Sequence, residues 1–226
     1  DLGTVSDQTM PIGMVRDVHG DATISRLDGD RLDGSPGLAI HQGDTIRTGV
    51  DSGLTVIFAD DTELSLGEDG NLVVDQLDYD PEALAGEARF NILQGVFLFL
   101  SGQIARFGSD AMSVSIPSAT IGIRGSQMVG SIIAGETRHH VTLLPDPDGQ
   151  VGEVVVTNRA GTGVLNRPWA TTWTIGGDRA PAAPAILSLR SLDALYPSLQ
   201  RPVPELPGDA GPARSSREFF TDEDGA

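Results

Sequence analysis

Short runs of alternating apolar and polar residues occupy most of this chain. From Gly13 to Gly177 the runs are broken by turn residues at intervals of about 8 to 12 positions. This spacing predicts an all-β domain of many short strands, arranged as a twisted solenoid-like stack, a sandwich or a barrel. Turn glycines that recur roughly every 24 to 30 residues favour the solenoid-like geometry, and they are Gly43, Gly67, Gly95 and Gly125.

The clearest hairpin is predicted around Asp60 and Asp61. Leu54, Val56 and Phe58 alternate before this turn, and the run E-L-S-L alternates after it. A second turn over 67–71 leads into a strand at 72–74, and the stretch 78–86 is predicted to form a loop. Further on, 90–99 is predicted to form two strands that meet in a turn or bulge at Gln94 and Gly95.

The segment 113–126, S-V-S-I-P-S-A-T-I-G-I-R-G-S, is predicted to be an alternating strand that ends at an arginine between two glycines. Gly122 and Gly125 allow the backbone beside Arg124 to adopt a positive φ or to approach another segment closely. Arg124 is a candidate recognition residue, but the preferred interpretation is that it stabilises the fold by pairing with a buried carboxylate, either Asp44 or Asp60. Arg47, in G-D-T-I-R-T-G, is interpreted in the same way.

The composition changes after Gly177. Residues 179–185, R-A-P-A-A-P-A, indicate a proline-rich linker, and 186–199 has leucines at helical spacing that predict one amphipathic helix ending near Pro197. The chain is therefore divided into a flexible lead-in (1–12), a β domain (13–177), a linker with its helix (178–200) and a disordered acidic tail (201–226).

The charge of the chain limits its partners. The 226 residues have a formal net charge of -17, and all 15 basic residues are arginine. A chain this acidic has no basic surface for polyanions, so nucleic acid and anionic membranes are not expected partners. Because the sequence begins with Asp1, we expect a processed or trimmed product, which leaves open whether a signal peptide or anchor was removed, and we expect membrane contact only through such an anchor or a partner.

Catalytic and cofactor sites are not predicted. The chain has no cysteine, and Ser101, Ser115 and Ser126 lack the Gly-x-Ser-x-Gly elbow of serine hydrolases. His139 and His140 are adjacent, so on a strand their rings point to opposite faces, and we expect a surface pair. Trp169 and Trp173 are expected to share one strand face and to cover the core, although aromatic pairs also bind sugars.

Calcium is the one metal for which the sequence offers candidate ligands. None of the acidic clusters has the spacing of an EF-hand loop, so solvated turns are the preferred interpretation. The cluster of most interest consists of Asp75, Asp78, Asp80 and Glu82; the others are Asp28, Asp30 and Asp33, and Asp146 with Asp148.

Four blocks of the sequence, in this order, resemble a FecR domain. The blocks are G-M-V-R-D-V-H-G-D-A-T-I-S-R-L-D-G, G-D-T-I-R-T-G-V-D-S-G-L-T-V-I-F-A-D-D-T-E-L-S-L, L-Q-G-V-F-L-F-L-S-G and I-P-S-A-T-I-G-I-R-G-S, and they span roughly 13–158. The chain departs from the family at Asp61, where a glycine is usual, at Ile116, where a threonine is usual, and at Ser126, where a threonine is frequent.

The resemblance implies an extracytoplasmic domain that acts through protein contacts. The best-known relatives regulate a sigma factor from the inner membrane, with a cytoplasmic helical segment, one membrane span and a secretin-and-TonB-type domain. None of these companions is visible in the sequence, so control of a sigma factor is not implied.

We therefore expect a non-enzymatic, periplasmic or extracellular module for signalling or scaffolding, whose partners are envelope or secreted proteins. Its strand edges and its C-terminal helix are the expected contact surfaces. A self-assembling structural component and a calcium- or glycan-binding module are the alternatives.

Overall fold

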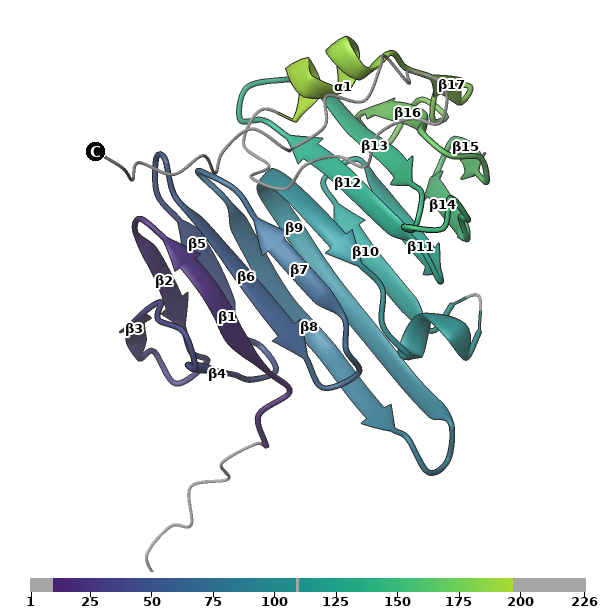
Figure 1. Cartoon of the computed structure of the whole chain (residues 1–226). Helices are drawn as coiled ribbons and strands as arrows, with labels where there is room; N and C mark the ends of the chain where they lie inside the picture. The colour runs from purple at the N-terminus through teal and green to yellow at the C-terminus, as the bar shows by residue number, and fades with distance from the viewer. Residues whose placement is uncertain (1–9, 109, 197–226) are drawn as a thin grey trace, which may run out of the picture.

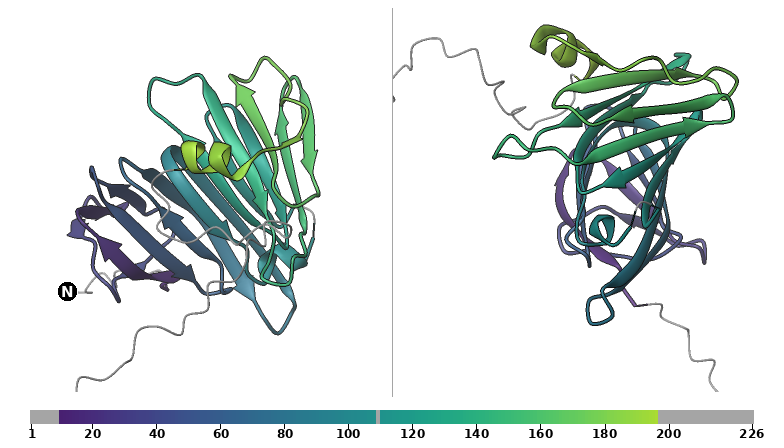
Figure 2. Two further views of the ribbon diagram at one scale, coloured as in Figure 1. Left: turned by 45° about the horizontal axis from the view of Figure 1, so that its top comes forward. Right: turned by 90° about the vertical axis from the view of Figure 1, so that its right-hand side faces the viewer.

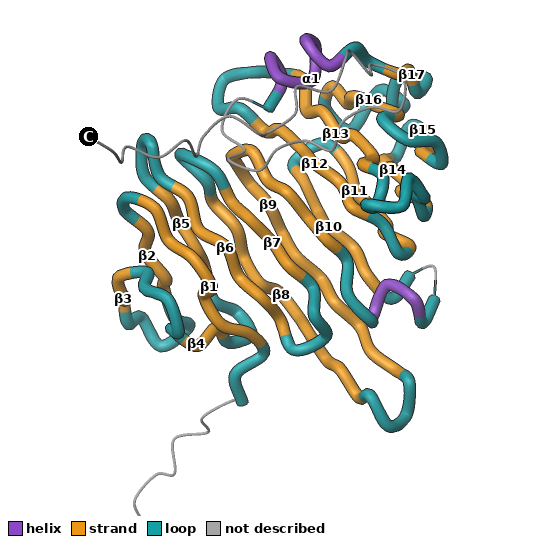
Figure 3. The backbone as a smooth tube through the Cα atoms, in the orientation of Figure 1, coloured by secondary structure: helices purple, strands orange, loops and turns teal. Residues whose placement is uncertain are grey.

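The computed structural model describes residues 10–108 and 110–196. Within these residues the chain forms seventeen β-strands, one short 3-10 helix η1 (Ile104–Arg106) and one α-helix, α1 (Leu189–Leu195) (Figure 1). Strands dominate the backbone trace throughout, as Figure 3 shows. The prediction of an all-β fold is confirmed, whereas most of the predicted lead-in and the whole predicted tail lie outside the described residues.

The strands form two layers, which we call sheet A and sheet B. Sheet A contains, in spatial order, β4 (Ala39–Ile40), β1 (Gly13–His19), β6 (Gly53–Phe58), β7 (Glu63–Leu66), the second half of β9 (Ala85–Leu100), β12 (Gln127–Ile132), β13 (Arg138–Leu144), β16 (Ala170–Ile175) and β17 (Ala185–Ile186). Sheet B contains β3 (Arg31–Asp33), β2 (Ala22–Ser25), β5 (Thr45–Thr48), β8 (Asn71–Asp80), the first half of β9, β10 (Met112–Ile116), β11 (Ala119–Arg124), β14 (Glu153–Asn158) and β15 (Gly161–Leu165).

After β9 the chain adds hairpins to the two sheets in turn. The β10–β11 hairpin joins sheet B, the β12–β13 hairpin joins sheet A, β14–β15 returns to sheet B and β16–β17 to sheet A. Among the described strands the pairing of β9 with β10 is parallel, and the other pairings are antiparallel. Of the geometries that the sequence left open, this is a sandwich, and its two layers are visible in Figure 2.

The core lies between the layers and follows from the alternation along each strand. Leu54, Val56 and Phe58 point inward from β6, as predicted, and the residues between them are only half-buried. Phe90 links the layers, because its ring lies 5.1 Å from that of Phe58 and 5.4 Å from that of Phe99. With few aromatics elsewhere, the rest of the core consists mainly of Val, Ile and Leu.

Strand β9 belongs to both sheets, and it corrects two predictions. The predicted loop at 78–86 is shorter than expected and consists of the turn 81–84, because β8 continues to Asp80 and β9 begins at Ala85. The stretch 90–99 is one continuous strand rather than two, but the predicted bulge is present, because the register with β8 shifts between Ile92 and Gln94 and the strand bends at Gly95, where φ is 111°. Phe90 and Ile92 face the core before the bend, and Phe97 and Phe99 face it afterwards, so the inward face changes from even to odd positions. A side chain at position 95 would lie 2.8 Å from the Cα atom of Gly70, which explains the glycine.

The outer face of sheet A carries a second apolar cluster, which α1 covers. The helix is shorter than predicted, because Ile186 belongs to β17 and Ser188 caps the helix at its N-terminus. The predicted positions Pro197 and Leu199 lie outside the described residues. Leu192 and Tyr196 are buried against the sheet, together with Val96, Leu98, Val129, Leu144 and Trp169.

The proline-rich segment 179–184 is held across the end of the sandwich. The amide of Ala182 donates to the carbonyl of Trp173 at 3.0 Å, and its carbonyl accepts from Thr172 Oγ1 at 2.7 Å. Asn158 donates to the carbonyl of Arg179 at 2.7 Å, and Pro181 packs against Gly163. This segment therefore lies between β15 and β16 as an ordered strap.

Candidate functional site

The arginine motif forms a hairpin, not the single strand that the sequence predicts. Strands β10 and β11 are joined by a turn at Pro117 and Ser118. Their apolar residues point into the core, and Val114, Ile116, Ile121 and Ile123 are all buried. The residues that alternate with them along the two strands lie on the outer face of sheet B, and they are Ser113, Ser115, Thr120, Gly122 and Arg124.

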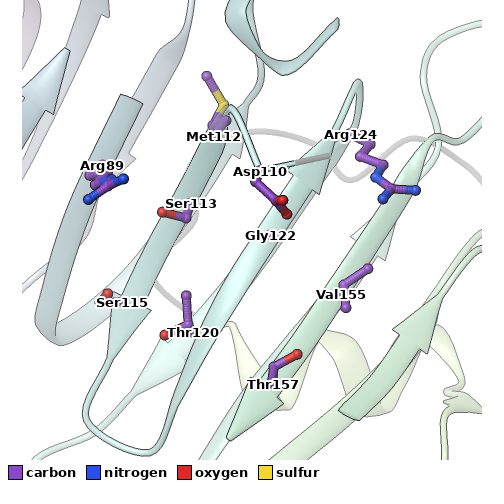
Figure 4. A pocket seen from close by; sticks show the side chains of 10 residues that line it. All are labelled: Arg89, Asp110, Met112, Ser113, Ser115, Thr120, Gly122, Arg124, Val155 and Thr157. Carbon is purple, nitrogen blue, oxygen red and sulfur yellow. The ribbon is translucent and has the colours of Figure 1, made fainter. Parts of the chain in front are cut away.

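Strand register aligns these outer residues with neighbours from other strands. One row across the sheet consists of Arg89, Ser113, Gly122 and Val155, and the next consists of Asn91, Ser115, Thr120, Thr157 and Thr162. Because these side chains are small, the face is hollowed into a groove of about 450 Å³. Figure 4 shows the hydroxyl groups on its floor and the arginines at its sides. We call this surface the sheet B groove.

Two arginines border the sheet B groove, and each contacts a carboxylate. Nη1 of Arg124 donates to Glu153 Oε1 at 2.8 Å, across the β11–β14 pair. Arg89 pairs with Glu87 on its own strand. The side chains of Arg124 and Arg89 are 48% and 57% exposed, so both guanidinium groups reach solvent. Asp110 lies above Gly122 and adds a carboxylate to the lining (Figure 4).

The predicted partners of Arg124 were wrong. Asp44 is buried and pairs with Arg26, and it also accepts from the amide of His41 at 2.7 Å. Burial raises the pKa of Asp44, against the opposing effect of the His41 and Arg26 contacts. Register explains the error, because Glu153 faces Arg124 from a strand that begins 29 residues further along the chain.

Asp60 fixes a different junction. Its carboxylate accepts from the amide of Thr62 at 3.0 Å, from the hydroxyl of Thr62 at 2.8 Å and from the amide of Ile104 at 3.2 Å. These bonds attach the β6–β7 turn to the segment after β9. Asp61 occupies the position where the FecR pattern has glycine, and its φ of 67° explains why glycine suits that position.

Gly43 and Arg47 lie apart from the groove. Gly43 has a φ of 84° in the turn before β5, and Arg47 is exposed on β5. Gly125 has a φ of 55° directly after β11, whereas Gly122 has no such backbone and serves instead as part of the groove floor.

The acidic clusters do not converge. Asp75, Asp78 and Asp80 are spread along β8, where Asp78 accepts from Gln76 and Asp80 accepts from the amides of Glu82 and Ala83. Burial raises the pKa of Asp75. Asp28 and Asp148 each accept a local backbone amide in their turns. Within the described residues, no group of three or more histidines or acids is placed to hold a metal ion.

The histidine prediction was wrong for one member of the pair. His139 is buried between the layers, where its Nδ1 lies 2.7 Å from Ser118 Oγ, and Ser118 Oγ lies 2.5 Å from Thr174 Oγ1. Burial lowers the pKa of His139. Burial also lowers the pKa of His140, and the nearby charge of Glu136 opposes this shift only weakly. Ser118 is only 3% exposed, so this serine and histidine join the two sheets and cannot meet a substrate.

Both tryptophans lie on the outer side of sheet A, but only Trp173 belongs to a strand. Trp169 precedes β16, has a φ of 65° and is buried under α1, so it covers an apolar cluster as expected, but on the outer face of sheet A. Trp173 lies within β16, and the guanidinium of Arg138 stacks 4.6 Å from its ring centroid.

Sequence reasoning did not identify Arg89, Asp110, Thr120, Thr157 or Glu153 as site residues. A signal was present, because Ser, Thr and Gly occupy the outward positions of both strands in the arginine motif. What the sequence lacked was the register that aligns β9 and β14 with that hairpin.

The fold and the motif define a two-layer β domain with one open polar face. A family model described as FecR protein matches residues 44–145, so this part of the chain is a FecR domain. Among curated proteins, none matches the sequence.

Two crystal structures of a candidate anti-sigma factor from Parabacteroides distasonis ATCC 8503 are similar to the chain. Each has 12% sequence identity, a TM-score of 0.48 and coverage of 66% of this chain. The chain spans 63% of the length of one of these structures and 62% of the other. In its described residues, the chain has no helix of the length and apolarity that a membrane span requires.

Proposed function

We propose that this chain is a non-enzymatic, protein-binding module of the periplasm or cell exterior, and that it contacts an envelope or secreted protein through the sheet B groove. One observation carries the proposal. The outer face of sheet A is covered by α1 over β9, β12 and β13, whereas on sheet B a groove of about 450 Å³ lies open between two exposed arginines.

The chemistry of the groove suits a polypeptide partner. Its hydroxyl groups donate and accept hydrogen bonds, and its guanidinium groups and the Asp110 carboxylate provide both signs of charge. A polar surface of this kind resembles the non-obligate interfaces of proteins that also exist alone. The FecR domain at 44–145 supports a role in envelope signalling, because protein contact is the mode of action that this family implies.

The helix is not the contact surface in this proposal. Leu192 and Tyr196 face the chain's own sheet, so the apolar side of α1 is already occupied. Docking of the helix into a partner would first require its release from Trp169 and the rest of that cluster.

Site-specific photocrosslinking tests the proposal. A benzophenone amino acid is placed at Ser115 in the groove and, as the matched control, at Thr55 on the outer face of sheet A, in cells of the source organism. We expect a defined crosslinked species from position 115 that is lost in the Arg89→Glu, Arg124→Glu double variant. Equal crosslinking from position 55, or crosslinking at 115 that survives the double variant, contradicts the proposal.

A further inference from the structure

Sheet edges are the places where a sandwich can accept another strand, and here they differ sharply. In the described part of the chain, β3, β4, β15 and β17 lie at the ends of the two sheets. Strand β3 has three residues and a charge at both ends, and β4 and β17 have two residues each. Very short or charged edges resist pairing with another chain.

Strand β15 has none of these protections. It has five residues, G-T-G-V-L, with no charge and no proline. Its register with β14 pairs Asn158 with Gly161 across a two-residue turn, so residues 161, 163 and 165 bond to β14. The amides and carbonyls of Thr162 and Val164 therefore point away from the sheet. Both side chains are exposed, with Val164 at 41%.

The proline-rich strap leaves this edge open. Pro181 packs against Gly163, which is buried and faces the interior of the sandwich. The backbone bonds of Ala182 go to β16 in sheet A and not to β15. The strap thus fills the space between the layers without pairing with the outer side of β15.

Positive charge flanks the open edge in an otherwise acidic chain. Arg159 precedes β15 and Arg167 follows it, and both are exposed. Arg159 pairs with Asp178, which is itself 75% exposed, so this contact is readily exchanged. An added strand of similar length would bring its two ends close to these guanidinium groups, since five residues extend about 17 Å.

We propose that β15 binds an extended segment of a partner protein as an additional strand of sheet B, and that this segment is uncharged in its centre and acidic at both ends. The inference rests on the proposed protein-binding function and adds a second contact to it. The hydroxyl row of the groove continues to this edge, because Thr157 Oγ1 lies 3.2 Å from Thr162 Oγ1. A second copy of the chain suits the edge less well, because antiparallel pairing about Gly163 would place Arg159 opposite Arg167 of the other copy.

The test uses the full chain and a labelled peptide of about nine residues, with alternating Thr and Val between terminal Asp residues, and a matched peptide with terminal Lys residues. Binding is measured by fluorescence anisotropy, and the contacted amides are located by NMR. We expect the Asp-ended peptide to bind at least about tenfold more tightly than the Lys-ended peptide, with a preference that weakens in salt. The amides of Thr162 and Val164 should shift most.

Three variants make the result specific. Val164→Pro removes an edge amide that no described strand uses, so it should leave the melting temperature unchanged and lower peptide affinity at least about tenfold. Val164→Thr keeps the amide and should keep the affinity. Arg159→Glu with Arg167→Glu should reverse the peptide preference.

The opposite outcomes are equally clear. Binding that is unchanged in Val164→Pro overturns the inference, and so does a concentration-dependent dimer that this substitution abolishes. Shifts confined to Arg89 and Arg124 place the peptide in the groove, which overturns the edge site but leaves the proposed function intact. Absence of crosslinking from Ser115 together with normal peptide binding at β15 would contradict the groove as a contact surface and leave the edge site intact.

Discussion

The outer faces of the two sheets differ in what covers them. On sheet A, Val129 and Leu144 are buried beneath α1, and Trp169 completes the seal. On sheet B, the equivalent surface is made of hydroxyl groups, one glycine and two arginines, and no described element covers it. The one α-helix of the described residues packs on sheet A and leaves the outer face of sheet B open, so the first face stabilises the fold and the second is available for binding.

The largest expected effect comes from placing the same charge on each face. Val129→Asp buries a carboxylate without a partner under α1, and we expect it to lower the free energy of unfolding by about 3 kcal/mol or more. Val155→Asp, at a half-buried position in the groove, should cost less than about 1 kcal/mol. Urea unfolding of both variants measures the difference. Equal costs would show that α1 does not seal sheet A.

The polar contact between the sheets is the next test. His139→Ala leaves Ser118 with one partner fewer inside the sandwich, although Ser118 keeps its contact with Thr174, and we expect a cost of about 2 kcal/mol at neutral pH. Because burial lowers the pKa of His139 below its ordinary 6.5, the unfolded chain takes up a proton below about pH 6.5 before the folded chain does. Stability should therefore fall as the pH drops below 6.5.

The variant should reduce this pH dependence without removing it, since the pKa of His140 is also lowered. Thermal melts of both proteins between pH 5 and pH 8 provide the measurement. A parent chain whose stability is constant over that range would show that His139 is not held in its neutral form.

Removing one hydrogen bond from each face should produce a smaller difference in stability than the preceding substitutions. Tyr196→Phe removes the buried bond to Thr142 Oγ1, 2.8 Å long, while Thr142 keeps Thr171 as a partner, so the cost should be about 1 kcal/mol. Thr157→Val removes an exposed bond in the hydroxyl row and should cost almost nothing. Chemical denaturation resolves the two, and similar losses would argue that the open face also stabilises the fold.

Only a small effect on stability is expected at the motif arginine. Arg124→Ala breaks an exposed ion pair, which contributes at most about 1 kcal/mol, whereas a buried carboxylate partner would make the cost about 3 kcal/mol. The same variant should weaken crosslinking from Ser115. A large loss of stability with unchanged crosslinking would show that Arg124 has only a structural role.

Local alternation was enough to predict some elements. The hairpin of β6 and β7 could be read directly, because Leu54, Val56 and Phe58 alternate strictly up to an Asp-Asp turn. Strand β9 could not be predicted as one strand, because its inward-facing residues change from even to odd positions at Gly95. In the sequence, such a change within an apolar run resembles a turn between two strands. The arginine motif was likewise divided by Pro117 and Ser118 at a point where alternation continues on both sides.

The groove could not be predicted from any single segment of the sequence. Arg89, Thr120 and Thr157 become neighbours through the register of four strands, and register is set by the whole sheet. The contact of Ser118 with His139 requires two sheets to meet, and the burial of Trp169 requires the helix to fold back. These arrangements are tertiary, so the sequence supplied their chemistry without their geometry.

The strand that both layers share also determines how the molecule opens. Each half of β9 lies at the centre of its sheet, with β8 and β10 on one side of the bend and β7 and β12 on the other. Neither layer can separate without breaking bonds to this strand, so its amides should exchange with deuterium only on global unfolding. The terminal hairpins should exchange by local opening instead, which would make β9 the slowest-exchanging segment of the domain.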